Sequence, residues 1–290
     1  MSSDLAPKTN EDLLEERAVH RRALKALQDA GLGPMVGGAY ALRCHTGYWR
    51  DTKDLDLFLL KTRIHEALAV LEKAGFRTEF TDPLWIAKGF DGPYFVDLIF
   101  SSGNGIAIVD ADWQRFAGRA LVLDLEALVV PAEEMIWSKA FIQERERFDG
   151  ADIHHLIRGN GSAFDWDRLL RRFDDHWPVL YGHLINFWFA FPSDRGQIPV
   201  AVMRELGSRL EAGLSQPVPG EKICRGTLLS RQQYLWELDH CGYLDARELE
   251  IADWRGDQTF PRPRKVFGRS ANEEKPGRGG EESNADRGGR

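Results

Sequence analysis

The sequence predicts a mixed α/β half followed by an all-helical half. Between residues 34 and 100, short apolar or alternating segments are separated by Gly, Pro and Asp, as in strands joined by turns. From Pro131 onward the pattern changes to one helix after another. Beyond Phe267 there is no bulky apolar residue, so a disordered tail is expected there. We therefore predict a core in residues 1–128, a helical domain in residues 129–245, and an extended segment with this tail in residues 246–290.

The individual elements follow from periodicity and from the residues that start and stop each segment. Asn10 could cap a first helix running to about Ala30, and a helix at Ile64–Lys73 is closed by Ala74 and Gly75 in a C-cap pattern. A helix-prone segment is also expected at residues 39–44. The expected strands span residues 34–36, 54–60, 76–80, 85–88, 94–100 and, as a weaker candidate, 121–123. The later helices are expected at residues 132–147, 151–157, 165–191 (where Pro178 could introduce a break), 200–214 and 230–241.

The composition is that of a globular protein without a strong electrostatic attraction to nucleic acid. The 290 residues are 43% hydrophobic and 29% charged, which allows a sizeable core, and the net charge is −7. No apolar run approaches the roughly 20 residues that span a bilayer, and the acidic N-terminus lacks the apolar centre of a signal peptide. The three cysteines are widely spaced. These features predict a cytoplasmic protein with reduced thiols and no membrane partner.

Two aspartates in a short strand are the first candidate site. In Asp54-Leu55-Asp56-Leu57-Phe58 successive side chains face opposite ways, so the leucines can enter a core while both aspartates face a cleft. Carboxylates this close repel each other unless a cation lies between them, and Mg²⁺ binds carboxylate and phosphate oxygens. Taken alone, the pair could equally be a solvated strand edge.

A third carboxylate strengthens the metal hypothesis. Asp97 lies in Tyr94–Phe100, where every neighbour is apolar or aromatic, so it is expected to be buried and to need a partner. A hydrogen-bonded core aspartate is the alternative. Three carboxylates on neighbouring strands are what a two-metal site needs, with ions about 4 Å apart.

Paired glycines precede the aspartates, separated from them by a helix-prone segment and a polar turn. Gly37 and Gly38 follow an apolar strand and open a helix-prone segment, so backbone amides there could approach an anion. An ordinary tight turn is the alternative, but the glycines come 16 residues before Asp54. Arg50, in the intervening turn, could contact phosphate or could pair with Asp51 or Asp54.

Together these residues resemble the polymerase-β-type nucleotidyltransferase superfamily. Its pattern is a Gly-Gly or Gly-Ser turn, then two alternating aspartates on the next strand, then a later acidic residue, here Gly37-Gly38, Asp54-Leu55-Asp56 and Asp97. The fuller segment from residue 37 to residue 58 is similar to abortive-infection toxins of the AbiEii type and their bacterial relatives. The resemblance implies an α/β (α+β) core with a small mixed sheet and transfer of NMP from an NTP, such as ATP, to a hydroxyl using Mg²⁺, with Mn²⁺ as the alternative. Tyr40 departs from many toxin relatives, so toxin biology does not carry over.

The helical half offers further candidates. Lys139 shares the apolar stripe of its helix, so an inward orientation with an anionic partner is expected, although it could instead extend to solvent. The toxin-like relatives place a phosphate-contacting lysine on such a helix, and they suggest an active-site aspartate at Asp149 or Asp152. Either aspartate could also serve the helix ahead, Asp149 as its cap and Asp152 near its positive end.

The leading function is a two-metal nucleotidyltransferase. Asp54 and Asp56 would hold both metals, while Asp97 would hold the metal on the nucleophile side and help to deprotonate the acceptor. The amides of Gly37 and Gly38 would bind the triphosphate, and Lys139 would neutralise its charge. The alternatives are a metal-dependent glycosyltransferase and a catalytically silent protein that binds a nucleotide or a partner. The acceptor could be a small molecule, a protein hydroxyl or an RNA 3′ end.

Overall fold

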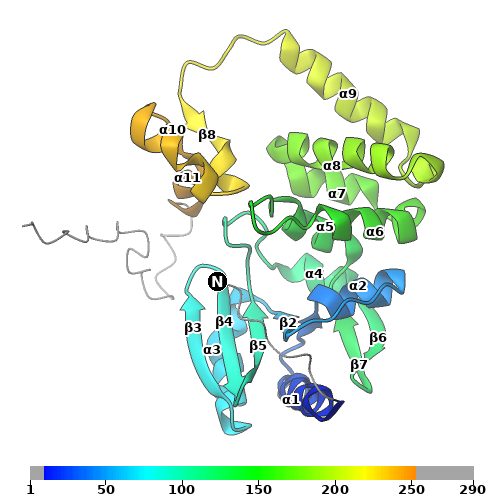
Figure 1. Ribbon diagram of the computed structural model, residues 1–290, viewed down its shortest axis with the longest axis vertical. Helices are drawn as coiled ribbons and strands as arrows, with labels where there is room; N and C mark the ends of the chain where they lie inside the picture. Colours follow the sequence, from blue (N-terminus) through cyan, green and yellow to red (C-terminus); the bar gives the residue numbers. More distant parts are fainter. Residues whose placement is uncertain (1–9, 253–290) are drawn as a thin grey trace, which may run out of the picture.

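The computed structural model describes residues 10–252, and the predicted tail beyond Phe267 lies outside the described residues. A seven-stranded sheet forms one layer, and a stack of helices lies against one end of it (Figure 1). The strand order is β3-β4-β5-β2-β1-β7-β6, in which β2 with β5 and β1 with β7 pair in parallel and the other neighbours are antiparallel. The predicted fold class, a mixed α/β core followed by a helical region, is confirmed.

The strands of the large sheet are short, and most of them lie where the sequence pattern places them. Their bounds are β1 (Met35–Val36), β2 (Asp54–Phe58), β3 (Arg77–Asp82), β4 (Ile86–Asp91), β5 (Tyr94–Ile99), β6 (Gly118–Val122) and β7 (Leu125–Val129). The weak strand expected at residues 121–123 is present as the end of β6, but it stops at Val122, because Leu123 and Asp124 adopt positive φ angles and form the turn between β6 and β7. The strand β7 was not predicted.

Helices cover the sheet and extend beyond it. Those of the first half are α1 (Asn10–Asp29), α2 (Gly38–Thr46), α3 (Ile64–Lys73) and α4 (Ala111–Phe116). The second half contains α5 (Ala132–Ala140), α6 (Gly150–Asn160), α7 (Trp166–Phe173), α8 (Trp177–Ala190) and α9 (Val200–Leu214). In Figure 1, α5 to α9 lie in successive layers above the sheet. Within the described part of the chain, no helix is both long and apolar enough to cross a bilayer.

Two predicted helices are shorter than expected. The helix expected at residues 132–147 ends at Ala140, whose carbonyl accepts a bond of 2.9 Å from the His183 ring, and a loop with a bridge between Gln143 and Phe148 follows. The helix expected at residues 165–191 is divided by the 3₁₀ turn Asp174–His176, and Pro178 lies in the first turn of α8 rather than at a break. Tertiary contacts therefore override the local helical pattern at residues 141–147.

A small group of elements follows α9. It consists of β8 (Ile223–Cys224), β9 (Leu244–Asp245), α10 (Leu235–His240), α11 (Ala246–Ala252) and short 3₁₀ turns. The helix expected at residues 230–241 is present only as α10 and the 3₁₀ turn before it, and the segment expected to be extended from residue 246 begins as a helix. This group packs beside the open end of the sheet (Figure 1), where Asn104 donates to the Leu228 carbonyl at 2.9 Å.

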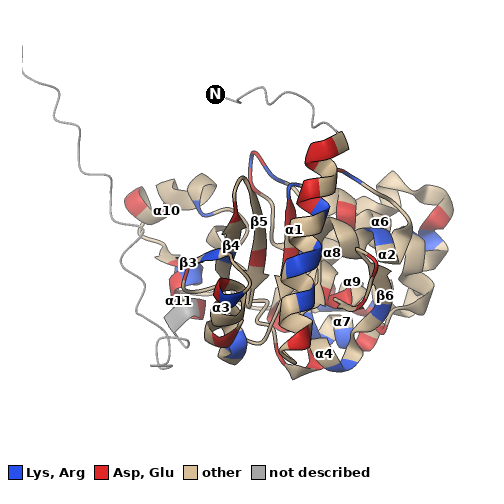
Figure 2. Cartoon of the chain, turned by 90° about the horizontal axis from the view of Figure 1, so that it is seen from below, with Lys and Arg blue, Asp and Glu red and all other residues tan. Residues whose placement is uncertain are grey.

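Charged residues are mixed over the described chain. In the view of Figure 2, acidic positions gather toward the N-terminal end of α1 and basic positions follow them, and both signs also occur on α3 and near α4 and α7. Both signs of charge are therefore present on this side of the molecule.

Candidate functional site

The three predicted aspartates meet on one face of the sheet. β2 and β5 pair in parallel with Asp56 opposite Asp97, and Asp54 lies two residues before Asp56 on the same face. Leu55 and Leu57 point the other way and have no exposed surface. The alternation expected from the sequence is confirmed, and it is the reason that this strand can serve the core and a cleft at once.

Their carboxylates form a compact acidic cluster. One oxygen from each of Asp54, Asp56 and Asp97 lies within 4.8 Å of the other two. Burial, followed by repulsion from Asp54 and Asp97, raises the pKa of Asp56 to about 7. Burial also raises the pKa of Asp97, although an ion pair with Lys88 works against the shift. A nearby cation would therefore stabilise the ionised form of both carboxylates.

The glycine pair leaves room for the cluster. Gly38 begins α2 with φ at +53°, and a Cβ built on it would lie 1.8 Å from Oδ2 of Asp56. A Cβ on Gly37 would lie 2.3 Å from the ring of Phe58. The N–H of Gly37 donates to the backbone carbonyl of Asp56 at 2.9 Å, so the expectation that this amide binds a triphosphate is wrong. Gly37 instead brings the start of α2 against β2, where the first N–H groups of the helix lack intrahelical partners.

The wall opposite the sheet is a buried ionic network. The Lys139 ammonium lies 2.7 Å from Asp149 and 2.9 Å from Asp152, and its side chain is 9% exposed. The inward orientation expected for Lys139 is therefore confirmed, and the solvent-exposed alternative is wrong. The side chain of Asp149 does not cap α6. Although burial would raise the pKa of Asp149, Lys139 and Arg147 hold it below its ordinary value.

Two arginines connect this network to the cleft. Arg50 donates to Asp152 at 2.9 Å, so it pairs with neither Asp51 nor Asp54. Arg147 contacts both oxygens of Asp149 at 3.2 Å, while 62% of its side chain remains exposed. Burial lowers the pKa of Arg147, but the negative charges of Asp149 and, more weakly, of Asp56 and Asp54 outweigh it, so the pKa lies above its ordinary value. Arg147 thus faces the acidic cluster, and the sequence did not single it out because it lay in a predicted helix.

Lys88 is a second residue that sequence reasoning missed. It lies on β4 directly opposite Asp97, and its ammonium is 2.6 Å from Oδ1 of Asp97. Only pairing of β4 with β5 brings the two together. The expectation that a buried Asp97 must have a partner could have prompted a search for a cation in the preceding strand.

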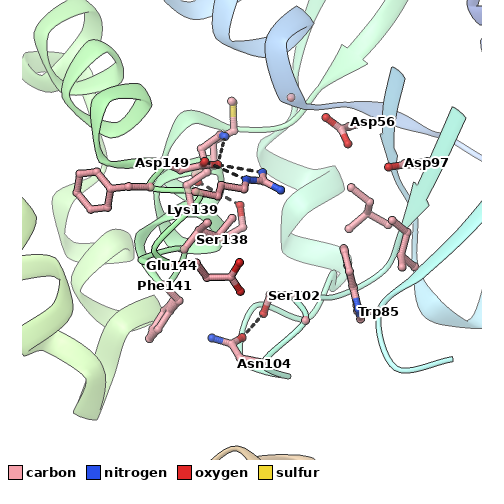
Figure 3. Close-up of a pocket in the computed structure, with 18 of the residues that line it drawn as sticks. Asp56, Trp85, Asp97, Ser102, Asn104, Ser138, Lys139, Phe141, Glu144 and Asp149 are labelled. Atoms are coloured by element: carbon pink, nitrogen blue, oxygen red, sulfur yellow. Dashed lines mark hydrogen bonds and ion pairs between the residues drawn. The ribbon is translucent and has the colours of Figure 1, made fainter. Parts of the chain in front are cut away.

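A cavity of about 900 Å³ separates the two walls. In Figure 3, Asp56 and Asp97 face it from the sheet, and Asp149, Lys139 and Ser138 lie on the opposite side. Trp85, Ser102, Asn104, Phe141 and Glu144 line the part farther from the aspartates (Figure 3). The group after α9 closes this far part with residues 227–229, Arg231 and Arg247. The cavity therefore has a region of carboxylates and cations, and a second region that is more mixed.

The residues present fit a divalent cation such as Mg²⁺. The cluster supplies carboxylate oxygens alone, the ligands that Mg²⁺ prefers. Asp97 already pairs with one cation, the ammonium of Lys88. The absence of a side chain at Gly38 keeps Asp56 in the cluster, because a Cβ there would displace its carboxylate. Asp54, which accepts a 2.6 Å bond from the Thr52 hydroxyl, is held in place at the edge of the cluster.

No protein-family model and no curated protein matches this chain. Among solved structures, it is similar to the antibiotic-resistance factor ANT(2'')-Ia, with 18% identity and a TM-score of 0.42 over 59% of this chain and 97% of that chain. It is also similar to the lincosamide antibiotic adenylyltransferase LnuA, with 14% identity and a TM-score of 0.36 over 52% of this chain and 98% of that chain. It is also similar to JHP933 from Helicobacter pylori, with 15% identity and a TM-score of 0.37 over 80% of this chain and 99% of that chain. At these identities and TM-scores, the similarities carry no conclusion about what this chain does.

Proposed function

We propose that this chain is a metal-dependent nucleotidyltransferase that moves NMP from an NTP to an acceptor hydroxyl. The observation that carries the proposal is the position of three clustered carboxylates beside the start of α2, with Gly38 leaving space where any side chain would collide with Asp56. One cleft therefore combines carboxylates that can bind a metal ion with helix amides that can bind phosphate. A triphosphate with a bound metal ion is the class of ligand that needs both.

The sheet side of the cleft holds the reacting groups. Asp54 and Asp56 would hold Mg²⁺ or Mn²⁺, and Asp97 would share in binding on the acceptor side. The bound metal would supply Lewis-acid stabilisation of the charge that develops on phosphoryl oxygens. Asp97 would also accept the proton of the acceptor hydroxyl. The N–H groups at the start of α2 would orient the triphosphate.

The opposite side of the cleft would bind the triphosphate. Arg147 has the most exposed cationic group of the network and faces Asp54 and Asp56, so it would contact phosphate oxygens directly. Lys139 forms ion pairs with Asp149 and Asp152, and it would add positive charge to this wall of the cleft while holding both aspartates in place. Arg50 would join the same phosphate-binding surface while paired with Asp152.

A direct test follows NMP and pyrophosphate together. Each NTP, labelled at the α-phosphate, is incubated with the protein, Mg²⁺ and three classes of acceptor: small hydroxyl compounds, protein and RNA 3′ ends. Labelled acceptor and equimolar pyrophosphate are expected for one class. Transfer of sugar from a UDP-sugar would favour the glycosyltransferase instead, and nucleotide binding without turnover would favour the silent binder. Membership of the AbiEii-like branch and a cytoplasmic location stay predictions.

Removing the charge of Arg147 should weaken NTP binding without unfolding the chain. A charge-assisted phosphate contact is worth roughly 1.5–3 kcal/mol. At ~1.4 kcal/mol per decade, Arg147→Met should lower kcat/KM for the NTP by about 10- to 150-fold. The buried Asp149 keeps its 2.7 Å ion pair with Lys139 when Arg147 is replaced, so the melting temperature should fall less than it does when Lys139 is replaced. Measuring kcat/KM and melting temperature on the same samples checks both expectations.

The matched variant is Lys139→Met, which keeps the length and the apolar stem. It should lower kcat/KM by a similar factor, but it should also destabilise the fold. It leaves the buried carboxylates Asp149 and Asp152 with one cation fewer, and breaking a buried pair costs about 3–5 kcal/mol. Arg145→Met, which removes an exposed cation from the same loop, serves as the control and should leave both values unchanged. A change below threefold in kcat/KM for Arg147→Met would remove Arg147 from the phosphate site.

A further inference from the structure

A lysine and two aspartates lie side by side in one row across three strands. Lys88 on β4 is opposite Asp97 on β5, and Asp97 is opposite Asp56 on β2. In-register residues on neighbouring strands project from the same face of a sheet, so all three side chains share the face that carries the acidic cluster. The cluster thus has a cation built into one side of it.

The contact between Lys88 and Asp97 is held firmly. The Nζ atom lies 2.6 Å from Oδ1 of Asp97, and the two side chains are only 21% and 9% exposed. The ammonium also lies 4.4 Å from the centre of the Phe95 ring, which favours a cation at its face. A short, sheltered, charge-assisted bond of this kind differs from a surface ion pair, which solvent weakens.

We propose that Lys88 controls how many divalent cations the carboxylate cluster binds before a nucleotide arrives. Its ammonium engages Oδ1 of Asp97, so Oδ2 is the oxygen that a cation can approach without coming close to the ammonium. It also reduces the formal charge of the cluster from −3 to −2. Asp54 and Asp56 then form a first cation site, while the site that includes Asp97 stays weak until a triphosphate supplies further oxygens and negative charge.

This inference rests on the proposed function, because it assumes that the nucleotide brings the second cation. Mg²⁺ commonly binds through one or two carboxylates together with substrate phosphates. If the second cation binds only together with the NTP, the reacting groups are brought into position only when the substrate is present. The role assigned to Lys88 is that of a positioning residue, acting through Asp97.

Binding of Mn²⁺ tests the proposal without any turnover. Free Mn²⁺ is counted by electron paramagnetic resonance at pH 8 as it is added to the full chain, alone and with a non-hydrolysable ATP analogue. The wild-type chain should bind one Mn²⁺ alone and two with the analogue. Lys88→Met should bind two without the analogue, with the second dissociation constant lowered by about tenfold or more. Lys88→Arg, which keeps the charge, should behave like the wild type.

The outcomes separate the role of Lys88 from the proposed function. If Lys88→Met binds Mn²⁺ with the stoichiometry and affinity of the wild type, or binds it more weakly, Lys88 is only a structural partner of Asp97. If the wild-type chain binds no Mn²⁺ in either condition, the metal-dependent function and this inference fail together. Circular dichroism checks folding, and Lys88→Gln, which keeps a hydrogen-bond donor but loses the charge, should reproduce the Met result if Lys88→Met does not fold.

Discussion

Replacing Asp56 with Asn is expected to reduce NMP transfer to background while the chain remains folded. The amide keeps the shape of the carboxylate but loses the charge and one strong metal ligand, and Asp56 is the member of the cluster in closest approach to Gly38. A metal ion contributes several kcal/mol to stabilising charge at the transition state, so its loss removes most of the rate. The measurement is labelled NMP transfer at saturating NTP and Mg²⁺.

The control for this variant is Asp124→Asn. Asp124 is exposed in the turn between β6 and β7 and has a positive φ, which Asn also tolerates. Asp124→Asn makes the same chemical change outside the cluster and outside the lining of the cavity, so it should leave transfer unaffected. Undiminished turnover by purified Asp56→Asn would rule out the assignment of the metal site.

The same substitution should change how stability depends on pH when metal is removed. The pKa of Asp56 rises from its ordinary 3.8 to about 7 on folding, so the folded chain holds a proton that the unfolded chain releases. Stability is therefore lost as the pH rises through the window from about 3.8 to about 7. In EDTA, the melting temperature of the wild type should fall more between pH 5 and pH 8 than that of Asp56→Asn, and Mg²⁺ should restore it. Equal slopes in thermal melts of the two proteins would contradict the raised pKa.

Local patterns were sufficient for the parts of the site that lie within single segments. The alternation in residues 54–58 predicts which side chains enter the core, because a strand has a period of two residues. The apolar surroundings of Asp97 predict its burial, and the stripe position of Lys139 predicts its inward orientation. In each case the observation that decides the outcome lies within a few residues of the group concerned.

Pairing between distant segments was not predictable in the same way. Lys88 reaches Asp97 only through the register of β4 and β5, and Arg50 reaches Asp152 across 102 residues of sequence. The sequence from Glu144 to Arg147 alternates in charge and was assigned to a helix, whereas bonds from the His183 ring and to Asp149 favour a loop. The amide of Gly37 was assigned to a ligand because its bond to the backbone of Asp56 depends on how β2 pairs.

Gly38→Ala should reduce NMP transfer by about 100-fold or more, because misplacing a reacting group by roughly 1 Å can cost that much. The new Cβ would lie 1.8 Å from Oδ2 of Asp56, so the carboxylate or the start of α2 must move. The added side chain also has to adopt φ near +53°, at a cost of roughly 1–2 kcal/mol. Backbone strain and displacement of Asp56 are therefore mixed in this single variant.

Gly47→Ala separates the two effects. Gly47 ends the same helix with φ at +73°, but a Cβ there would meet nothing within 4 Å. It carries similar backbone strain without touching the cluster, so both variants should lose stability while only Gly38→Ala should lose transfer and Mn²⁺ binding. Transfer rates are compared below both melting temperatures. If the two variants lose activity equally, strain in α2 accounts for the effect, and the space at Gly38 is not what positions Asp56.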